Sequence, residues 1–169
     1  STPEGIFVRD FDPAGNSISG ETLLDSDGEQ ATSADAYALW RRPTAQALIL
    51  RDSSTNDIDV IPVSDTLDGY GLDANANGPM AVWKSLTDSE PAVHVIYGRK
   101  GFGPSASSFI IEPNVQTFHA PRIAATANGI RVLTSDSAGQ LKVYSDTGVL
   151  AQAFNTNSVR QPEISAGHG

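Results

Sequence analysis

Three acidic side chains at alternating positions come closest, in residue type and spacing, to a metal-binding motif. They are Asp25, Asp27 and Glu29, and the glycine between the last two would allow the sharp turn of a calcium loop. A complete EF-hand loop places a bidentate Glu at its twelfth position, where this chain has Ala36. The run therefore predicts either a calcium site made by Asp25, Asp27 and Glu29 or a simple acidic turn. Calcium is the one cofactor that this sequence suggests.

Two tryptophans, Trp40 and Trp83, are candidate ligand-binding residues. Each ends an apolar run, and the two recur at a distance of roughly 40–50 residues, the length of one repeat in several repeat proteins. An exposed indole ring can stack on the apolar face of a sugar, whereas a buried one packs in the core. The matching positions favour packing between repeats, and glycan binding is the alternative.

Basic residues beside aromatic ones suggest a second kind of contact surface. Arg41 follows Trp40 directly, and Arg99 and Phe102 lie in the glycine-rich segment 98–104. That segment lacks the Gly-Lys-Ser/Thr ending of a phosphate-binding loop, so it predicts a hairpin and not a nucleotide site. We expect these residues to contribute to a patch that contacts a glycan, peptide or protein ligand.

The sequence offers little for catalysis. The three histidines, His94, His119 and His168, stand at no metal-binding spacing and beside no acid in a catalytic order, and the chain has no Cys. The sequence does not decide whether the protein is an enzyme, but it argues against enzymatic activity.

Charge and hydropathy exclude several classes of partner. The formal net charge is −9, which opposes binding to nucleic-acid phosphates, and we expect no nucleic-acid partner. No apolar run approaches the ~18 residues of a membrane-spanning helix. Only 18% of the residues are charged, so the polarity comes mainly from small uncharged residues, unlike a helical bundle.

The apolar residues fall in short runs separated by turn-forming residues, which is the pattern of an all-β protein. Asn77-Gly78 and Asn128-Gly129 are typical hairpin turns. The predicted strands are Ile6–Phe11, Glu21–Leu24, Gln30–Asp35, Tyr37–Arg41, Ala47–Asp52, Ile58–Val63, Leu72–Gly78, Met80–Ser85, Val93–Arg99, Ser108–Glu112, Arg122–Ala125, Ile130–Thr134, Leu141–Ser145 and Val149–Phe154.

The predicted strands recur in sets of four, as in the blades of a β-propeller. The sequence indicates a single all-β repeat domain over 1–169 with about three complete blades of four antiparallel strands and a split one. The blades cover 29–69, 70–118 and 119–158, and the split one joins 1–28 to 159–169 with a strand near 161–167. The chain is then a section of a longer propeller or a propeller with a composite blade. A β-sandwich is the alternative fold.

The segment Gly5-Ile-Phe-Val-Arg-Asp-Phe-Asp-Pro-Ala-Gly-Asn-Ser-Ile-Ser-Gly-Glu-Thr-Leu-Leu resembles repeats of large type-I-secreted, RTX-type bacterial exoproteins and adhesins. Pro121-Arg-Ile-Ala-Ala-Thr-Ala-Asn-Gly, Gln161-Pro-Glu-Ile-Ser-Ala and Met80-Ala-Val-Trp match further parts of their pattern, whereas residues 41–75 depart from it. The resemblance implies a secreted, propeller-like module without catalytic activity.

Together these observations predict a non-enzymatic structural or ligand-binding module that is extracellular or on the cell surface. A calcium-assisted lectin-like or peptide-binding adhesin domain is one alternative, and a propeller-type glycan hydrolase or lyase is another. Unpaired strand edges also predict self-association, or a partner chain that completes the split blade.

Overall fold

The computed structural model describes residues 5–64, 66–87, 90–115, 119–136, 138–156 and 163–164. Within these ranges the chain is built from β-strands, and the one helical element is the 3-10 turn Pro43–Ala45. The prediction of an all-β protein is therefore confirmed. None of the helical structure described is long and apolar enough to cross a membrane.

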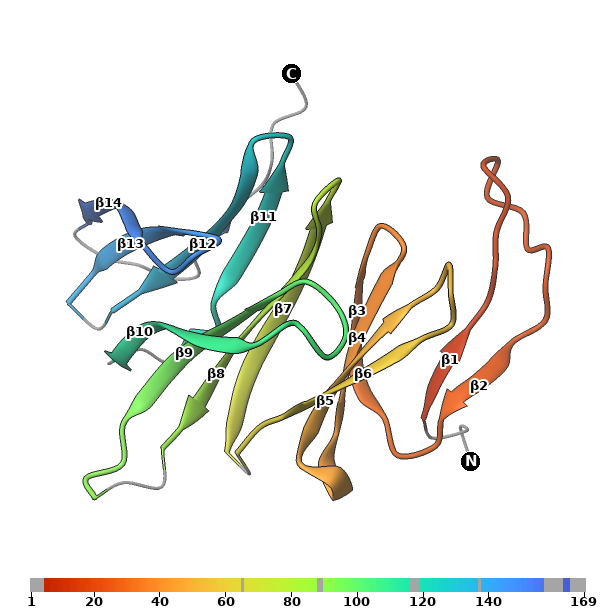
Figure 1. Ribbon diagram of the computed structural model, residues 1–169, viewed down its shortest axis with the longest axis horizontal. Helices are drawn as coiled ribbons and strands as arrows, with labels where there is room; N and C mark the ends of the chain where they lie inside the picture. The colour runs from red at the N-terminus through yellow and green to blue at the C-terminus, as the bar shows by residue number, and fades with distance from the viewer. Residues whose placement is uncertain are drawn as a thin grey trace.

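The strands form one two-stranded and three four-stranded antiparallel sheets, in chain order (Figure 1). The first sheet is β1 (Ile6–Val8) and β2 (Thr22–Asp25). The second is β3 (Glu29–Ala34), β4 (Tyr37–Arg42), β5 (Ala47–Asp52) and β6 (Ile58–Pro62). The third is β7 (Leu67–Asn75), β8 (Gly78–Leu86), β9 (His94–Lys100) and β10 (Ser108–Val115). The fourth is β11 (Arg122–Thr126), β12 (Gly129–Ser135), β13 (Gln140–Ser145) and β14 (Leu150–Asn155).

Tight hairpins connect the first two strands of each complete sheet. In the third sheet Asn75 pairs with Gly78, and in the fourth Thr126 pairs with Gly129, which leaves two residues in each loop. Gly78 and Gly129 have φ values of 103° and 132°, a region that residues with a Cβ rarely adopt. The two Asn-Gly turns predicted from the sequence therefore lie where the strands reverse.

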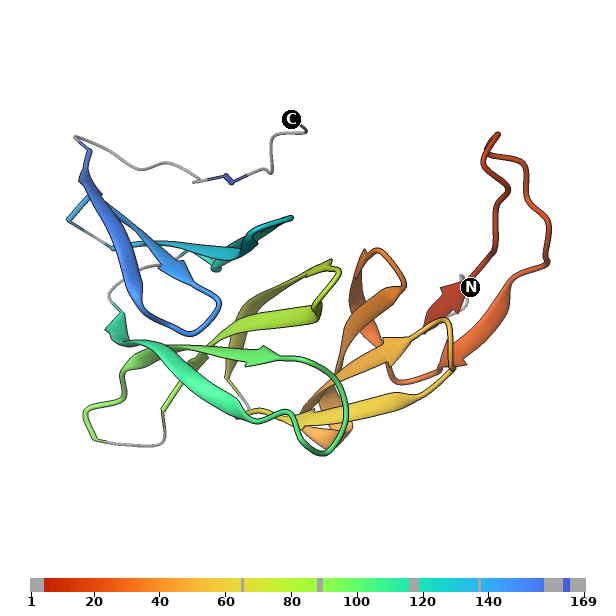
Figure 2. The same cartoon turned by 45° about the horizontal axis from the view of Figure 1, so that its top comes forward.

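The four sheets are arranged along an open arc, with the first and fourth sheets at its two ends (Figure 2). Neighbouring sheets approach most closely through their first strands, β3 with β7 and β7 with β11. The described sheets do not close into a ring. Four sheets of this kind are more than the two of a β-sandwich.

The third sheet lies between the second and the fourth and buries side chains on both of its faces. Successive side chains of a strand point to opposite faces of the sheet. Along β8, Ala81 and Trp83 pack with residues of the second sheet, whereas Met80 and Val82 pack with residues of the fourth. The buried residues between the second and third sheets are Leu39, Leu48, Leu50, Ile61, Leu72, Ala81 and Trp83. Those between the third and fourth are Met80, Val82, Ile96, Ile111, Val115, Ile130, Val132 and Tyr144.

A carboxylate from the last strand of each of the first three sheets reaches the following sheet. Asp25 at the end of β2, Asp59 in β6 and Glu112 in β10 are the three, and we call them the junction acids. Burying a carboxylate is unfavourable unless donors surround it, and each junction acid has such donors in the next sheet. The donors to Asp25 are Trp40 and Arg42, those to Asp59 are Arg99 and the Gly103 amide, and those to Glu112 are Thr134 and Lys142.

Candidate functional site

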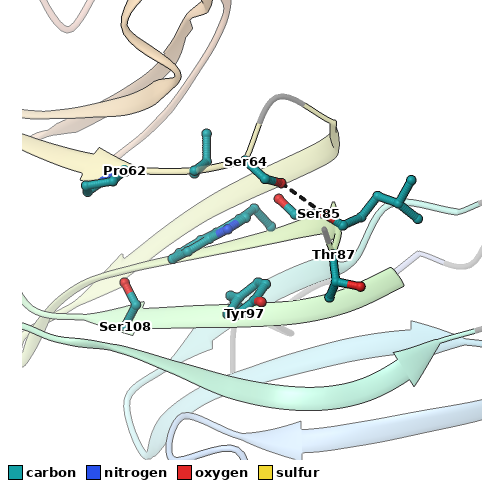
Figure 3. Close-up of a pocket in the computed structure, with 9 residues that line it drawn as sticks. Pro62, Ser64, Ser85, Thr87, Tyr97 and Ser108 are labelled. Carbon is teal, nitrogen blue, oxygen red and sulfur yellow. Dashed lines mark hydrogen bonds between the residues drawn. The ribbon is translucent and has the colours of Figure 1, made fainter. Parts of the chain in front are cut away.

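A cavity of about 380 Å³ lies between the second and third sheets, where β6 ends (Figure 3). Its volume falls in the range of roughly 300–1,000 Å³ that is usual for small-molecule sites. One wall is the segment that follows β6, and the other is formed by β8, β9 and the start of β10. The lining residues are Pro62, Val63, Ser64, Trp83, Ser85, Leu86, Thr87, Tyr97 and Ser108.

An aromatic pair forms one part of the cavity wall. Trp83 of β8 and Tyr97 of β9 are directly opposite each other in the antiparallel ladder. Their ring centroids are 5.6 Å apart with an interplanar angle of 17°, so the rings are stacked. Cross-strand aromatic pairs of this kind stabilise a sheet and hold both rings in place. The cavity therefore has a rigid apolar wall before any ligand enters.

The most informative residue of the cavity is Ser85. Its side chain is 3% exposed, and its Oγ is the one buried side-chain polar atom without a hydrogen-bond partner in the part of the chain that the structure describes. Nearby, the Ser64 hydroxyl donates to the Leu86 carbonyl oxygen at 3.1 Å, as drawn in Figure 3. A buried hydroxyl without a partner costs about 1–3 kcal/mol, so its presence at a cavity wall calls for an explanation.

Comparison with the preceding junction explains why a cavity is present here. Trp40 and Trp83 occupy equivalent positions, and each faces the sheet that precedes its own. Two residues after Trp40 the chain has Arg42, and two residues after Trp83 it has Ser85, so Arg42 and Ser85 are also equivalent. The guanidinium of Arg42 reaches back to Asp25 with an Nη2–Oδ2 distance of 2.7 Å. A serine at the corresponding place is too short to fill the same space, and the cavity results.

The lining described here combines hydroxyl, aromatic and aliphatic groups. Hydroxyls both donate and accept hydrogen bonds, and the Trp83 indole adds a further donor. A matching ligand is uncharged, carries several hydroxyl or amide groups and has an apolar face. A neutral sugar meets all three conditions, and so does a short uncharged peptide segment.

The structure places Asp25 of the predicted calcium loop inside the protein. Its Oδ2 accepts hydrogen bonds from the Trp40 indole N–H at 2.7 Å and from Arg42 Nε at 2.9 Å, and the residue is 7% exposed. Burial raises the pKa of Asp25, but the hydrogen bonds from Trp40 and Arg42 outweigh it, and the pKa is lowered from its ordinary value. Asp25 is thus a charged acceptor at the first sheet junction.

The other two predicted calcium ligands line a shallow polar recess of about 370 Å³. Asp27 accepts hydrogen bonds from the Thr44 backbone N–H at 3.3 Å and from the Thr44 hydroxyl, and Glu29 lies 4.0 Å from Arg41. Among the residues that the structure describes, no three His, Cys, Asp or Glu side chains are grouped to hold a metal ion. Calcium binding by Asp25, Asp27 and Glu29 stays a prediction.

The structure brings one of the five predicted ligand-binding residues, Trp83, to the cavity and places the other four elsewhere. Trp40 is 1% exposed and packs against the first sheet. Arg41 is partly buried and faces Glu29. Arg99, 9% exposed, binds Asp59 with an Nη2–Oδ2 distance of 2.6 Å, and Phe102 packs at the cluster between the second and third sheets. The proposed Arg99–Phe102 contact patch stays a prediction.

Sequence reasoning missed Ser85, Ser64 and Ser108 because serine is common in this chain and nothing local distinguishes these three. A usable signal was present at one of them. The repeat alignment sets Ser85 against Arg42, and a change from a long to a short side chain at equivalent inward-facing positions indicates a space between sheets.

The fold and the cavity define the chain as an all-β repeat protein of four-stranded antiparallel sheets with a preformed cavity at one sheet junction. Comparisons with protein-family models, with curated proteins and with solved structures find no match to this chain.

Proposed function

We propose that this chain is a non-enzymatic binding module of a secreted bacterial protein and that it holds a neutral glycan in the cavity beside Trp83. The observation that carries the proposal is the Ser85 hydroxyl, which is buried at the cavity wall without a partner. Proteins leave such groups unpaired mainly where something else completes them. A ligand whose binding shifts the wall enough to uncover this oxygen supplies the missing hydrogen bond.

The chemistry of the lining supports a sugar over a charged ligand. Sugars present hydroxyls around an apolar ring face, and the cavity presents Ser64, Ser85 and Ser108 around the Trp83–Tyr97 pair. The overall charge of −9 disfavours anionic glycans at long range. Secretion is proposed from the resemblance of residues 5–24 to exoprotein repeats.

The proposal includes the architecture in which the sheets serve as propeller blades. Support comes from the stacking of the three complete sheets through their faces, with first strands adjacent along the concave side of the arc. The first sheet has two strands where the others have four, as a split blade requires. The predicted strand at 161–167, which would belong to the split blade, lies mostly outside the described residues. Completion of the split blade by a partner chain is the alternative.

Titration calorimetry with small neutral and charged sugars tests the binding proposal. The probes are glucose, galactose, mannose, N-acetylglucosamine and their short oligomers, with sialyllactose as the anionic comparison. We expect saturable binding of at least one neutral sugar, without turnover of the sugar. Ser85→Ala should weaken binding about 2- to 10-fold, since one hydrogen bond contributes roughly 0.5–1.5 kcal/mol.

Two further variants separate this site from nonspecific effects. Ser64→Leu fills the cavity and should abolish binding, whereas Ser105→Ala removes an exposed hydroxyl outside the cavity and should leave binding unchanged. Preference for sialyllactose, or equal binding by all three variants, would contradict the proposed site.

A further inference from the structure

The last strand of the fourth sheet, β14, is exposed along its whole length. All six residues of Leu150–Asn155 are exposed, with Leu150 at 50% and Phe154 at 43%. Within the described chain β13 is its one strand neighbour, so the backbone groups of its outer edge have no ladder partner. Figure 2 shows β14 at one end of the arc. An open edge of this kind pairs with another strand unless something blocks it.

The equivalent outer strands of the second and third sheets are blocked. β6 contains Asp59 and ends at Pro62, and β10 contains Glu112 and Pro113. Proline lacks the N–H that a ladder requires, and inward or edge charges discourage pairing with other chains. β14 has the sequence Leu-Ala-Gln-Ala-Phe-Asn, with neither a proline nor a charge. Of these three outer strands, only β14 lacks protection.

β14 also lacks the group that joins each earlier sheet to the next one. The junction acids Asp25, Asp59 and Glu112 stand on the last strands of the first three sheets, and β14 contains no acid. A further sheet could not dock on β14 by the same chemistry. The open backbone edge of this strand, beyond which no described strand pairs, is therefore the place where we expect a partner.

We propose that β14 pairs antiparallel with β14 of a second copy of this chain and forms a continuous eight-stranded sheet across a two-fold axis. Such an interface uses the same strand twice and needs no separate complementary surface. A neutral strand suits it, because each chain carries a net charge of −9 and like charges opposite each other in a ladder are unfavourable. In the register that pairs all six residues, Leu150 faces the second copy's Asn155, Ala151 its Phe154 and Gln152 its Ala153.

The size of the contact sets the expected strength. Six residues a side are far fewer than the roughly 20–30 a side of a standard protein interface, so the dimer is weak. We expect a dissociation constant on the order of 100 µM, with dimers dominant only above that concentration. The monomer is then the main species in dilute solution.

Sedimentation equilibrium and light scattering of the full chain from 10 µM to 1 mM test the proposal. The expected molar mass rises from 17.8 kDa toward twice that value with concentration. Gln152→Lys combined with Ala153→Lys sets lysines against lysines across the axis and should raise the dissociation constant at least tenfold. Gln152→Lys combined with Ala153→Glu sets lysine against glutamate across the axis and should return the dissociation constant to that of the unchanged chain.

A matched control and an independent measurement complete the test. Val60→Lys places a lysine on the outer strand β6, where Val60 is 52% exposed, and should leave the dimer unchanged. Hydrogen exchange should show concentration-dependent protection of amides within 150–155. A monomer at 1 mM, a dimer insensitive to the double lysine change, or protection elsewhere without protection of β14 would each overturn the proposal.

Discussion

Removing the Ser85 hydroxyl should stabilise the protein, contrary to the usual effect of a substitution in a buried strand. In Ser85→Ala the side chain loses an oxygen that has no partner, and the Cβ that packs against its neighbours is retained. The structure therefore predicts that the free energy of unfolding rises by about 1–2 kcal/mol, within the cost assigned to a buried unpaired polar group. For a chain of this length that corresponds to a midpoint of thermal unfolding higher by roughly 2–8 °C.

Thr134→Val is the matched control because it also removes one buried hydroxyl from the second strand of a four-stranded sheet, at the position equivalent to Ser85. The Thr134 hydroxyl donates to Glu112 at 2.6 Å, and the residue is 2% exposed. Valine keeps the shape and removes the hydrogen bond to a charged acceptor, so the expected loss of unfolding free energy is about 1.5–3 kcal/mol.

Urea unfolding followed by tryptophan fluorescence measures both variants without added sugar. Opposite signs for Ser85→Ala and Thr134→Val are the expected result. If both variants lose similar amounts of unfolding free energy, Ser85 has a hidden partner and the argument for a ligand at this wall is refuted.

Three further predictions concern the first sheet junction. Asp25→Asn should lower the free energy of unfolding at pH 7 by about 1–3 kcal/mol, because Arg42 and Trp40 lose a charged acceptor. The pKa of Asp25 is lowered in the folded state. The ionised carboxylate therefore stabilises the fold above the ordinary pKa of an aspartate, and this stabilisation is lost as the pH falls through the folded-state pKa. In that pH range the stability of Asp25→Asn should fall less steeply than that of the unchanged protein. Gly28→Ala should destabilise by about 1–3 kcal/mol, as its Cβ would lie 2.4 Å from Ile6 Cγ1, whereas Gly20→Ala meets nothing within 4 Å and should be neutral in the same melts. The calcium hypothesis predicts a melting midpoint several degrees higher in calcium chloride than in chelator, and equal midpoints would contradict it.

Strand positions could be predicted from the sequence because each strand is a local apolar run between turn residues. The largest difference is at β7, predicted over Leu72–Gly78 and observed over Leu67–Asn75. The first strand also differs, since it was predicted over Ile6–Phe11 and is observed over Ile6–Val8. There the Asp12 carboxylate accepts from the Ala14 and Asn16 backbone amides, and this turn directs the chain away from the ladder early.

Spacing alone does not identify the counterpart of Tyr97 and Tyr144 in the second sheet. Counting back from Tyr97 by the same spacing that separates Tyr144 from Tyr97 leads to Leu50, but Leu50 packs toward the following sheet, whereas Tyr97 and Tyr144 pack toward the preceding one. Ile49, which pairs with Trp40 as Tyr97 pairs with Trp83, is the true counterpart. A slip of one residue exchanges the two faces of a strand, and spacing alone does not detect it when both faces are apolar.

The cavity could not be predicted in the same way, because it forms where side chains from two different sheets leave space unfilled between them. Trp83 was found through its repeat position, but Ser85 matters for the space that it leaves. The junction acids had a local signal that was not used: Asp59 and Glu112 each interrupt an apolar strand, and a lone acid in such a strand needs donors from elsewhere in the fold.

The junction acids also give the array a direction. Each complete internal sheet carries an acceptor on its last strand and the matching donors on its middle strands, so it presents a different chemistry to the sheet before it and the sheet after it. A unit copied in frame by gene duplication would carry an acceptor for the sheet after it and donors for the sheet before it. Growth of such a protein by repetition is therefore polar, and a sheet added after β14, which carries no acid, would need a different connection.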